Sequence, residues 1–218
     1  MSQISGIRVT LKAAVSLDGK IATASGNSKW ITGETARRRA HQLRVENDAI
    51  LVGINTVLID DPRLTVRGFK EGTSPLRIVL DSKARIPEKS QVFKKDGVPV
   101  IIVTGNNAPP RKWPKLSDLT VIRAPTSKPE IIWLLSELKK FGIKNLLVEG
   151  GSLVNASFLK SKCVSGLELF LAPKIIGGQK SISWCGDLNI DSIEETSKLS
   201  ITAVTSLGKD WLISAKTK

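Results

Sequence analysis

Two glycines separate a short apolar run from a stretch with helical periodicity. In the segment LLVEGGSLVNASFL, Glu149 ends the apolar run, and Gly150 and Gly151 precede an expected helix over residues 152–159. Glycines permit a tight turn and leave the first backbone N–H groups of the helix accessible to an anion such as a pyrophosphate. The spacing matches neither the G-x-G-x-x-G fingerprint nor a Walker A loop. The segment indicates an anion site, although many such junctions need two glycines merely to turn.

A hydroxyl and two cations follow a second apolar run. The segment DSKAR, residues 81–85, comes directly after RIVL. Ligands of open α/β sheets bind at the carboxyl ends of the strands. There, Ser82, Lys83 and Arg85 would suit the 2′-phosphate of a ribose. A solvated basic turn would have the same composition.

Two adjacent carboxylates, Asp60 and Asp61, open the segment DDPRLTVR. Paired carboxylates could carry out acid–base chemistry, but Asp-Asp-Pro is also a good turn opener. Arg67, at the end of the segment, could bind a phosphate with its forked guanidinium. By itself the segment favours a structural turn.

Lys12 interrupts a run of small and apolar residues, and Glu149 ends another such run. A cation in a buried strand either extends to the rim of the sheet or faces a polar pocket. Opposite charges at strand ends are expected in a polar site between a sheet and its ligand. A salt bridge at the rim is the alternative.

Other chemistries are excluded by what the sequence lacks. It has no tyrosine, which excludes reductases that use a tyrosine general acid. The single histidine, His41, follows three arginines and favours a solvated helix face. One histidine and two distant cysteines do not form a zinc site, so no metal is expected.

The elements that must position these groups alternate between strands and helices. Helices are expected at 33–46, capped by Thr32, from Pro129 to before Gly142, and at 152–159. Strands are expected at 7–15, 48–53, 76–80, 98–103, 119–122, 144–148, 167–172, 199–205 and 211–215. This order predicts one α/β domain over residues 1–218, with a mostly parallel central sheet, flanking helices and a more antiparallel C-terminal end.

The net charge of +13 raises the possibility of a nucleic-acid-binding module. Lysine and arginine are spread evenly along the chain, however, and no aromatic stacking platform is evident, so no nucleic-acid partner is expected. No apolar run approaches the roughly 20 residues that span a bilayer. The cysteines form no CxxC pair or disulfide framework, which favours the cytoplasm.

Five segments within about residues 7–178 together resemble the pyrimidine reductase family of riboflavin biosynthesis. They are LKAAVSLDGKIATASGNSKWIT, ILVGINTVLIDDPRLTVR, RIVLDSKARIP, LLVEGGSLVNASFL and LAPKIIGG. The resemblance implies a dihydrofolate-reductase-like fold, NADPH as hydride donor and a homodimer. The implied reaction converts the ribosyl side chain of 2,5-diamino-6-ribosylamino-4(3H)-pyrimidinone 5′-phosphate to a ribitylamino group.

The resemblance also implies roles for particular residues. With the glycines and the basic segment above, the expected cofactor contacts are Val15, Trp30, Thr56, Asp60, Ser82, Lys83, Arg85, Gly150, Gly151, Ser152, Leu153, Val154 and Asn155. The last five belong to a segment, Gly151–Ser157, that binds the cofactor in the family. Expected substrate contacts are Ser28, Arg44, Leu64, Arg67 and Glu149. Lys12 matches a lysine near the ribose carbon that is reduced. We expect Lys12 and Glu149 to be catalytic, with Arg67 and Arg44 holding the 5′-phosphate.

In bacteria this reductase commonly follows a zinc deaminase. No H-x-E or PCxxC motif precedes the matched segments, so the chain resembles the stand-alone type of archaea and fungi, which is expected to act before deamination. Three alternatives remain. They are the same reduction on the deaminated 5-amino-6-ribosylaminouracil 5′-phosphate, another dihydrofolate-reductase-like reductase such as one acting on a pterin, and the nucleic-acid-binding module.

Overall fold

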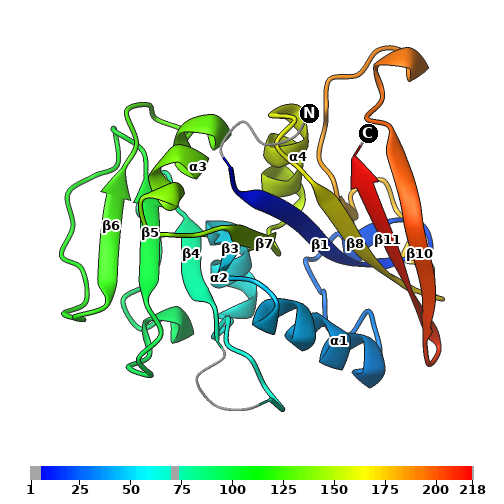
Figure 1. Ribbon diagram of the computed structural model, residues 1–218, viewed down its shortest axis with the longest axis horizontal. Helices are drawn as coiled ribbons and strands as arrows, with labels where there is room; N and C mark the ends of the chain where they lie inside the picture. The colour runs from blue at the N-terminus through cyan, green and yellow to red at the C-terminus, as the bar shows by residue number, and fades with distance from the viewer. Residues whose placement is uncertain (1–5, 70–73, 218) are drawn as a thin grey trace.

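The computed structural model describes residues 6–69 and 74–217 of the chain. The strands of its main sheet are β1 Arg8–Ser16, β3 Ala49–Gly53, β4 Leu76–Leu80, β5 Val100–Thr104, β6 Leu119–Arg123, β7 Asn145–Val148, β8 Gly166–Ala172, β10 Leu199–Leu207 and β11 Asp210–Thr217. They lie in the order β10-β11-β8-β1-β7-β3-β4-β5-β6 (Figure 1). From β8 to β6 all neighbours are parallel, whereas β11 and β10 add antiparallel at the β8 edge. The predicted mostly parallel sheet with an antiparallel C-terminal end is confirmed.

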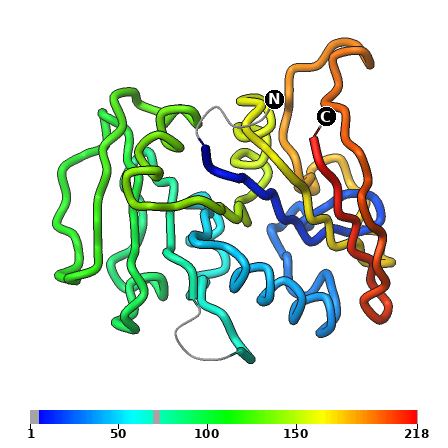
Figure 2. The backbone as a smooth tube through the Cα atoms, viewed as in Figure 1, coloured from blue at the N-terminus to red at the C-terminus, as the bar shows by residue number. Residues whose placement is uncertain are grey.

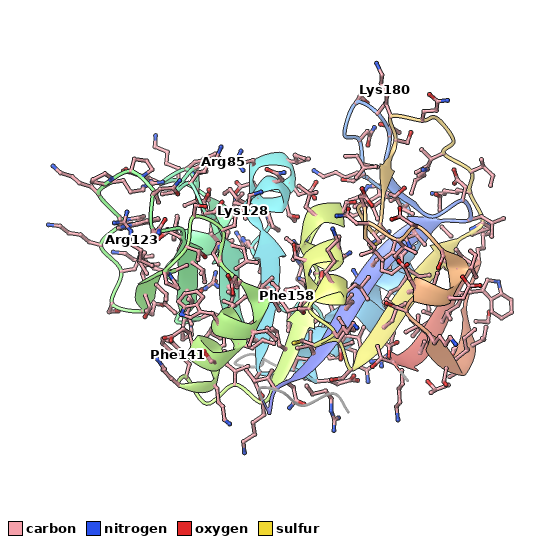
Figure 3. All side chains as sticks on the ribbon, turned by 90° about the horizontal axis from the view of Figure 1, so that it is seen from above. Arg85, Arg123, Lys128, Phe141, Phe158 and Lys180 are labelled. Carbon is pink, nitrogen blue, oxygen red and sulfur yellow. The ribbon has the colours of Figure 1, made fainter. Side chains whose placement is uncertain are left out.

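Helices cover both faces of this sheet. They are α1 Glu34–Val45, α2 Ile54–Asp60, α3 Ile131–Lys139 and α4 Ser152–Lys160, with short 3₁₀ turns η1 Gln91–Phe93 and η2 Ile193–Glu195. One core joins α3 and α4 to the sheet through fully buried Leu134 and Phe158, which packs between α4 and the strands (Figure 3). On the opposite face, α1 packs through Leu43, and α2 through Val57. No helix in the described ranges combines the length and apolar character needed to cross a membrane.

The side chains of β1 alternate between the two helical layers. Leu11 belongs to the core under α3 and α4, so Lys12 faces the α1 layer. In β7, Leu147 packs against α1, and Glu149, two residues later, emerges on the same side. Sheet geometry therefore directs Lys12 and Glu149 to one side of neighbouring strands.

Two local features of the structure differ from what the sequence predicts. The expected N-cap of α1 at Thr32 is wrong, because Gly33 is the N-cap and no side chain caps the helix. The Gly33 N–H instead donates to Asp210 Oδ2 at 2.6 Å, which ties the start of α1 to β11. A second, two-stranded sheet, β2 Lys20–Ala22 with β9 Ile182–Ser183, was not predicted, because strands this short carry too little periodicity.

Candidate functional site

A cleft of about 520 Å³ opens where β1, β3, β4 and β7 end. This is the edge at which parallel sheets bind ligands. Figure 3 shows Arg85 and Lys180 at this end of the molecule and Phe141 at the other. The lining of the cleft includes Lys12, Ala13, Ala14, Ile21, Ala22, Ser28, Gly53, Asn55, Thr56, Ile59, Asp60, Ser82, Arg85, Glu149, Gly150, Gly151, Ser152, Leu153, Val154 and Ile182.

The two glycines after β7 serve different purposes. A Cβ atom on Gly150 would lie 2.6 Å from Val154 Cβ, and one on Gly53 would lie 2.7 Å from Val154 Cγ2. Glycine at both positions lets the first turn of α4 pack directly on β3 and β7. A Cβ on Gly151 would meet only Thr56 Oγ1, at 3.9 Å. Gly151 is the N-cap of α4 and no side chain caps the helix, so its first amides face the cleft without an internal partner.

Three charged side chains meet beside the cleft, of which Lys12 and Glu149 line it and Arg44 does not. Arg44 from α1 donates to both carboxylate oxygens of Glu149, from Nε at 2.8 Å and from Nη2 at 2.9 Å. Lys12 Nζ lies 3.5 Å from Glu149 Oε2. The exposed fractions of these side chains are 15% for Arg44, 10% for Glu149 and 14% for Lys12. A forked guanidinium–carboxylate pair therefore holds the carboxylate beside the ammonium group.

The pair fixes the ionisation of Glu149. Burial by itself raises the pKa of this carboxyl, but the charges of Arg44 and Lys12 and the hydrogen bonds from Arg44 outweigh burial and lower the pKa to about 2. Burial lowers the pKa of Arg44, and the charge of Glu149 more than compensates, so that pKa is raised. Glu149 is consequently an anion at neutral pH and has no proton to donate.

Most predicted cofactor contacts line the cleft. They are Thr56, Asp60, Ser82, Arg85, Gly150, Gly151, Ser152, Leu153 and Val154. Ser28, a predicted substrate contact, lies beside them and donates from Oγ to Asp60 Oδ1 at 3.1 Å. Arg85 donates to Asn55 Oδ1 at 3.0 Å, which holds its guanidinium near α2. The structure thus brings the glycine pair, the segment after β4 and α2 together.

Four predicted cofactor residues do not line the cleft. Val15 points to the face opposite Lys12 and is 1% exposed, so only its backbone is available to a ligand. Asn155 is buried and donates from Nδ2 to the carbonyl of Trp184 at 2.7 Å. Trp30 is exposed and stacks under the Arg37 guanidinium. Lys83 is exposed beside the cleft-lining residues of its segment.

The predicted substrate residues are held in different ways. The side chain of Leu64 is buried in the core under α2, which leaves its backbone for a ligand. Arg44 donates to Glu149 and also to the carbonyl of Thr65, at 2.8 Å, so each of its three nitrogens makes one hydrogen bond within the protein. Arg67 is exposed, and its guanidinium makes no hydrogen bond or ion pair with the residues that the structure describes.

The two neighbouring aspartates have separate roles. Asp60 lines the cleft, whereas Asp61 is the C-cap of α2, with a φ of 39°, and accepts the Gln91 N–H at 2.8 Å. The turn interpretation is therefore right for Asp61, and the two carboxylates do not form a catalytic pair.

The connection between β8 and β10 rises beyond the sheet (Figure 2), and its residue Ile182 lines the cleft. Asp18 accepts the N–H groups of Ile176, at 3.0 Å, and Gly177, at 2.7 Å. The pairing of β2 with β9 then brings Ile21 and Ile182 to the cleft. Sequence reasoning missed Ile182, although Asp18 and Gly177 both lie in quoted motifs.

His41 is not on a solvated helix face, and that prediction is wrong. Its side chain is half-buried, and Nδ1 accepts the N–H of Arg67 at 3.3 Å. The spacing to Arg44, three residues later on the same helix, is the signal that could have placed it near the site.

The sequence pattern of the RibD C-terminal domain matches residues 8–213. The chain belongs to this family. It is 41% identical to the 2,5-diamino-6-ribosylamino-4(3H)-pyrimidinone 5′-phosphate reductase of Methanothermobacter thermautotrophicus, over 94% of this chain and 95% of that protein. It is 42% identical to the riboflavin biosynthesis protein RibD of Aquifex aeolicus, over 94% of this chain but only 56% of that protein. The chain thus spans little more than half of the RibD proteins it matches.

Solved structures extend the likeness to the fold. A deaminase/5-amino-6-(5-phosphoribosylamino)uracil reductase from Thermotoga maritima superimposes with a TM-score of 0.82 at 30% identity, over 97% of this chain and 57% of that one. A dihydrofolate reductase from Enterococcus faecalis superimposes with a TM-score of 0.54 at 10% identity, over 98% of this chain and 97% of that one. The predicted dihydrofolate-reductase-like fold is confirmed.

Proposed function

We propose that the chain is an NADPH-dependent oxidoreductase of riboflavin biosynthesis that reduces the ribosyl side chain of 2,5-diamino-6-ribosylamino-4(3H)-pyrimidinone 5′-phosphate. The observation that carries the proposal is the cluster of Lys12, Glu149 and Arg44 beside the glycine-started helix α4. The archaeal relative named for this reaction matches over nearly its whole length, which favours the diamino substrate over its deaminated counterpart.

The cleft fits a phosphorylated dinucleotide. The uncapped start of α4 at Gly151 offers backbone N–H groups to a pyrophosphate. Ser82 and Arg85, at the end of β4, offer a hydroxyl and a guanidinium to a ribose 2′-phosphate, which distinguishes NADPH from NADH. Thr56 and Asp60 line the space between these two positions. When bound, NADPH supplies the hydride that adds to C1′ of the substrate.

The remaining chemistry is proton transfer and positioning. The ribosylamine opens to an imine; as C1′ is reduced, the electron pair of the C=N bond moves to nitrogen, which takes up a proton. The Lys12 ammonium is the proton donor in this proposal, and Glu149 holds it in place. Glu149 also accepts hydrogen bonds from the pyrimidine, while Arg67 binds the 5′-phosphate from the exposed rim.

We further propose that the chain is a single reductase domain that acts in the cytoplasm as a homodimer. Support for the dimer comes from β10 and β11, where exposed Ile201, Val204 and Trp211 share one face because a bulge follows Ile201. Light scattering of Val204→Glu should show monomers where the unaltered protein shows dimers. A monomeric unaltered protein would overturn the homodimer.

The experiment that tests the proposed reaction identifies its product. Incubation with NADPH and the diamino substrate should yield a compound heavier by one H₂ unit, in an amount equal to the NADPH oxidised. NADPH oxidation without that product would reject the proposed reaction.

A further inference from the structure

Helix α1 holds the segment before Arg67 through two residues one helical turn apart. His41 and Arg44 are three positions apart, so their side chains leave the same face of the helix. Arg44 Nη1 donates to the carbonyl of Thr65 at 2.8 Å, and His41 Nδ1 accepts the N–H of Arg67 at 3.3 Å. The two contacts lie on either side of Val66.

The direction of the Arg67 side chain depends on this backbone. Its guanidinium has no hydrogen-bond or ion-pair partner among the described residues. Upstream, the buried side chain of Leu64 anchors the segment, and the Val66 N–H donates to Ser74 Oγ at 3.0 Å. Immediately downstream, Gly68 has a φ of 74°, a conformation that lets the chain turn away. Among the residues that the structure describes, the contact with His41 is therefore the last hydrogen bond to the backbone before this turn.

The environment of His41 keeps its imidazole neutral. Burial lowers the pKa first, the positive charges of Arg44, Arg67 and Lys12 add to this effect, and Glu149 opposes it, which leaves a pKa of about 4. Nδ1 accepts a hydrogen bond only in the neutral ring, in the tautomer that carries its proton on Nε2. The imidazole is thus an acceptor throughout the neutral pH range.

We propose that His41 is a positioning residue that fixes the backbone of Arg67, so that the guanidinium is ready to meet the 5′-phosphate of the substrate. This inference rests on the proposed function, in which Arg67 binds that phosphate. Because the phosphate is remote from the reacting C1′, its binding stabilises the ground state and the transition state alike. Loss of His41 should therefore raise KM and leave kcat nearly unchanged.

The test compares His41→Ala, His41→Asn and Gln42→Ala. Asparagine can place an amide oxygen near the position of Nδ1, whereas alanine offers no acceptor. Gln42 is exposed on the same helix and serves as the matched control. Calorimetric binding of ribose 5-phosphate is one measurement, because it requires no turnover. The KM and kcat for the diamino substrate are the other.

We expect His41→Ala to weaken ribose 5-phosphate binding and raise KM by roughly three- to tenfold, the effect of one lost hydrogen bond. His41→Asn should recover most of the loss, and Gln42→Ala should match the unaltered protein. In an Arg67→Ala background, His41→Ala should have little further effect. Unchanged binding in His41→Ala, or an undiminished effect without Arg67, would overturn the proposal.

The same measurements separate this inference from the proposed function. If the unaltered protein binds ribose 5-phosphate through Arg67 and His41 but reduces no ribosylaminopyrimidine, the reaction is rejected and the positioning role stands. If turnover is normal but His41→Ala binds the sugar phosphate normally, only the positioning role is rejected. If the unaltered protein does not bind ribose 5-phosphate, both the phosphate-binding role of Arg67 and the positioning role of His41 are rejected.

Discussion

Arg44 and Glu149 form a bidentate ion pair, with Nε–Oε1 and Nη2–Oε2 distances of 2.8 and 2.9 Å. The pair joins α1 to the residue that follows β7, beside the cleft that Glu149 lines. It leaves Glu149 as an anion at neutral pH, 3.5 Å from the Lys12 ammonium. In the proposed reaction Lys12 therefore supplies the proton, and Glu149 orients the donor.

Replacement of the carboxylate tests this division of roles. Glu149→Gln removes the counter-charge of buried Arg44, so we expect the free energy of unfolding to fall by about 3 kcal/mol. The turnover number should fall as well, because Lys12 loses its partner. Glu46→Gln is the matched control, since its ion pair with Arg39 is more exposed, at 28% for Arg39 and 43% for Glu46, and should contribute less than about 1 kcal/mol. Urea titration and kcat measure both effects, and equal stability of the two variants would contradict the account.

The pH dependence follows from the same carboxylate. Its folded pKa of about 2 lies below the ordinary value of 4.5, so the stabilisation is complete above about pH 4.5 and is lost as the pH falls toward 2. Between pH 5 and 8 we expect no change in kcat that depends on Glu149. Stopped-flow rates of the unaltered protein and of Glu149→Gln, measured over this range, should have the same pH profile. A step present only in the unaltered protein would show that Glu149 titrates during catalysis.

Lys12 should affect catalysis and leave cofactor binding nearly unchanged. Lys12→Ala should lower kcat by on the order of 10²-fold or more, the usual contribution of a positioned proton donor, with the Kd for NADPH nearly intact. Lys12→Arg keeps the positive charge but gives up its proton far less readily, so it should also be slow. Steady-state rates and fluorescence titration with NADPH make the distinction. Full activity of Lys12→Arg would mean that only the charge is needed.

The two glycines before α4 should respond differently to alanine. Gly150→Ala places a methyl group 2.6 Å from Val154 Cβ, so α4 must shift, at a cost of about 1–3 kcal/mol. Gly151→Ala meets nothing nearer than 3.9 Å and should cost less than about 1 kcal/mol, the effect of alanine in place of glycine at an N-cap. Thermal unfolding of both variants tests this contrast, and the reverse order of stability would contradict the packing described for β7 and α4.

Asp18 should act on cofactor affinity through the connection after β8. Asp18→Asn can accept only one of the two N–H groups of Ile176 and Gly177, so the connection that carries Ile182 should loosen. We expect a severalfold higher Kd for NADPH with near-normal kcat at saturation. Asp187→Asn, which alters a local turn in the same connection, is the control and should change neither quantity.

The sequence best predicts the structural features that are set by residues close together along the chain. Alternation along β1 places Lys12 on one face, and the two glycines mark the start of α4, so both were found without a structure. Apart from Lys12 and Glu149, contacts between distant segments were not foreseen. The bond from Asp18 to Gly177 joins residues 159 positions apart, and β9 has only two residues. His41 was assigned to solvent because its neighbours are arginines, although its own side chain turns toward the segment that carries Arg67.

The most direct test of the central claim is NADPH oxidation with the diamino-ribosylaminopyrimidinone phosphate, measured beside its deaminated counterpart. The account predicts that the diamino compound is reduced, with a clearly higher kcat/KM than the deaminated compound. Lys12→Ala should oxidise almost no NADPH with either compound. If a folded protein that binds NADPH oxidises it with neither compound, the assigned reaction is wrong.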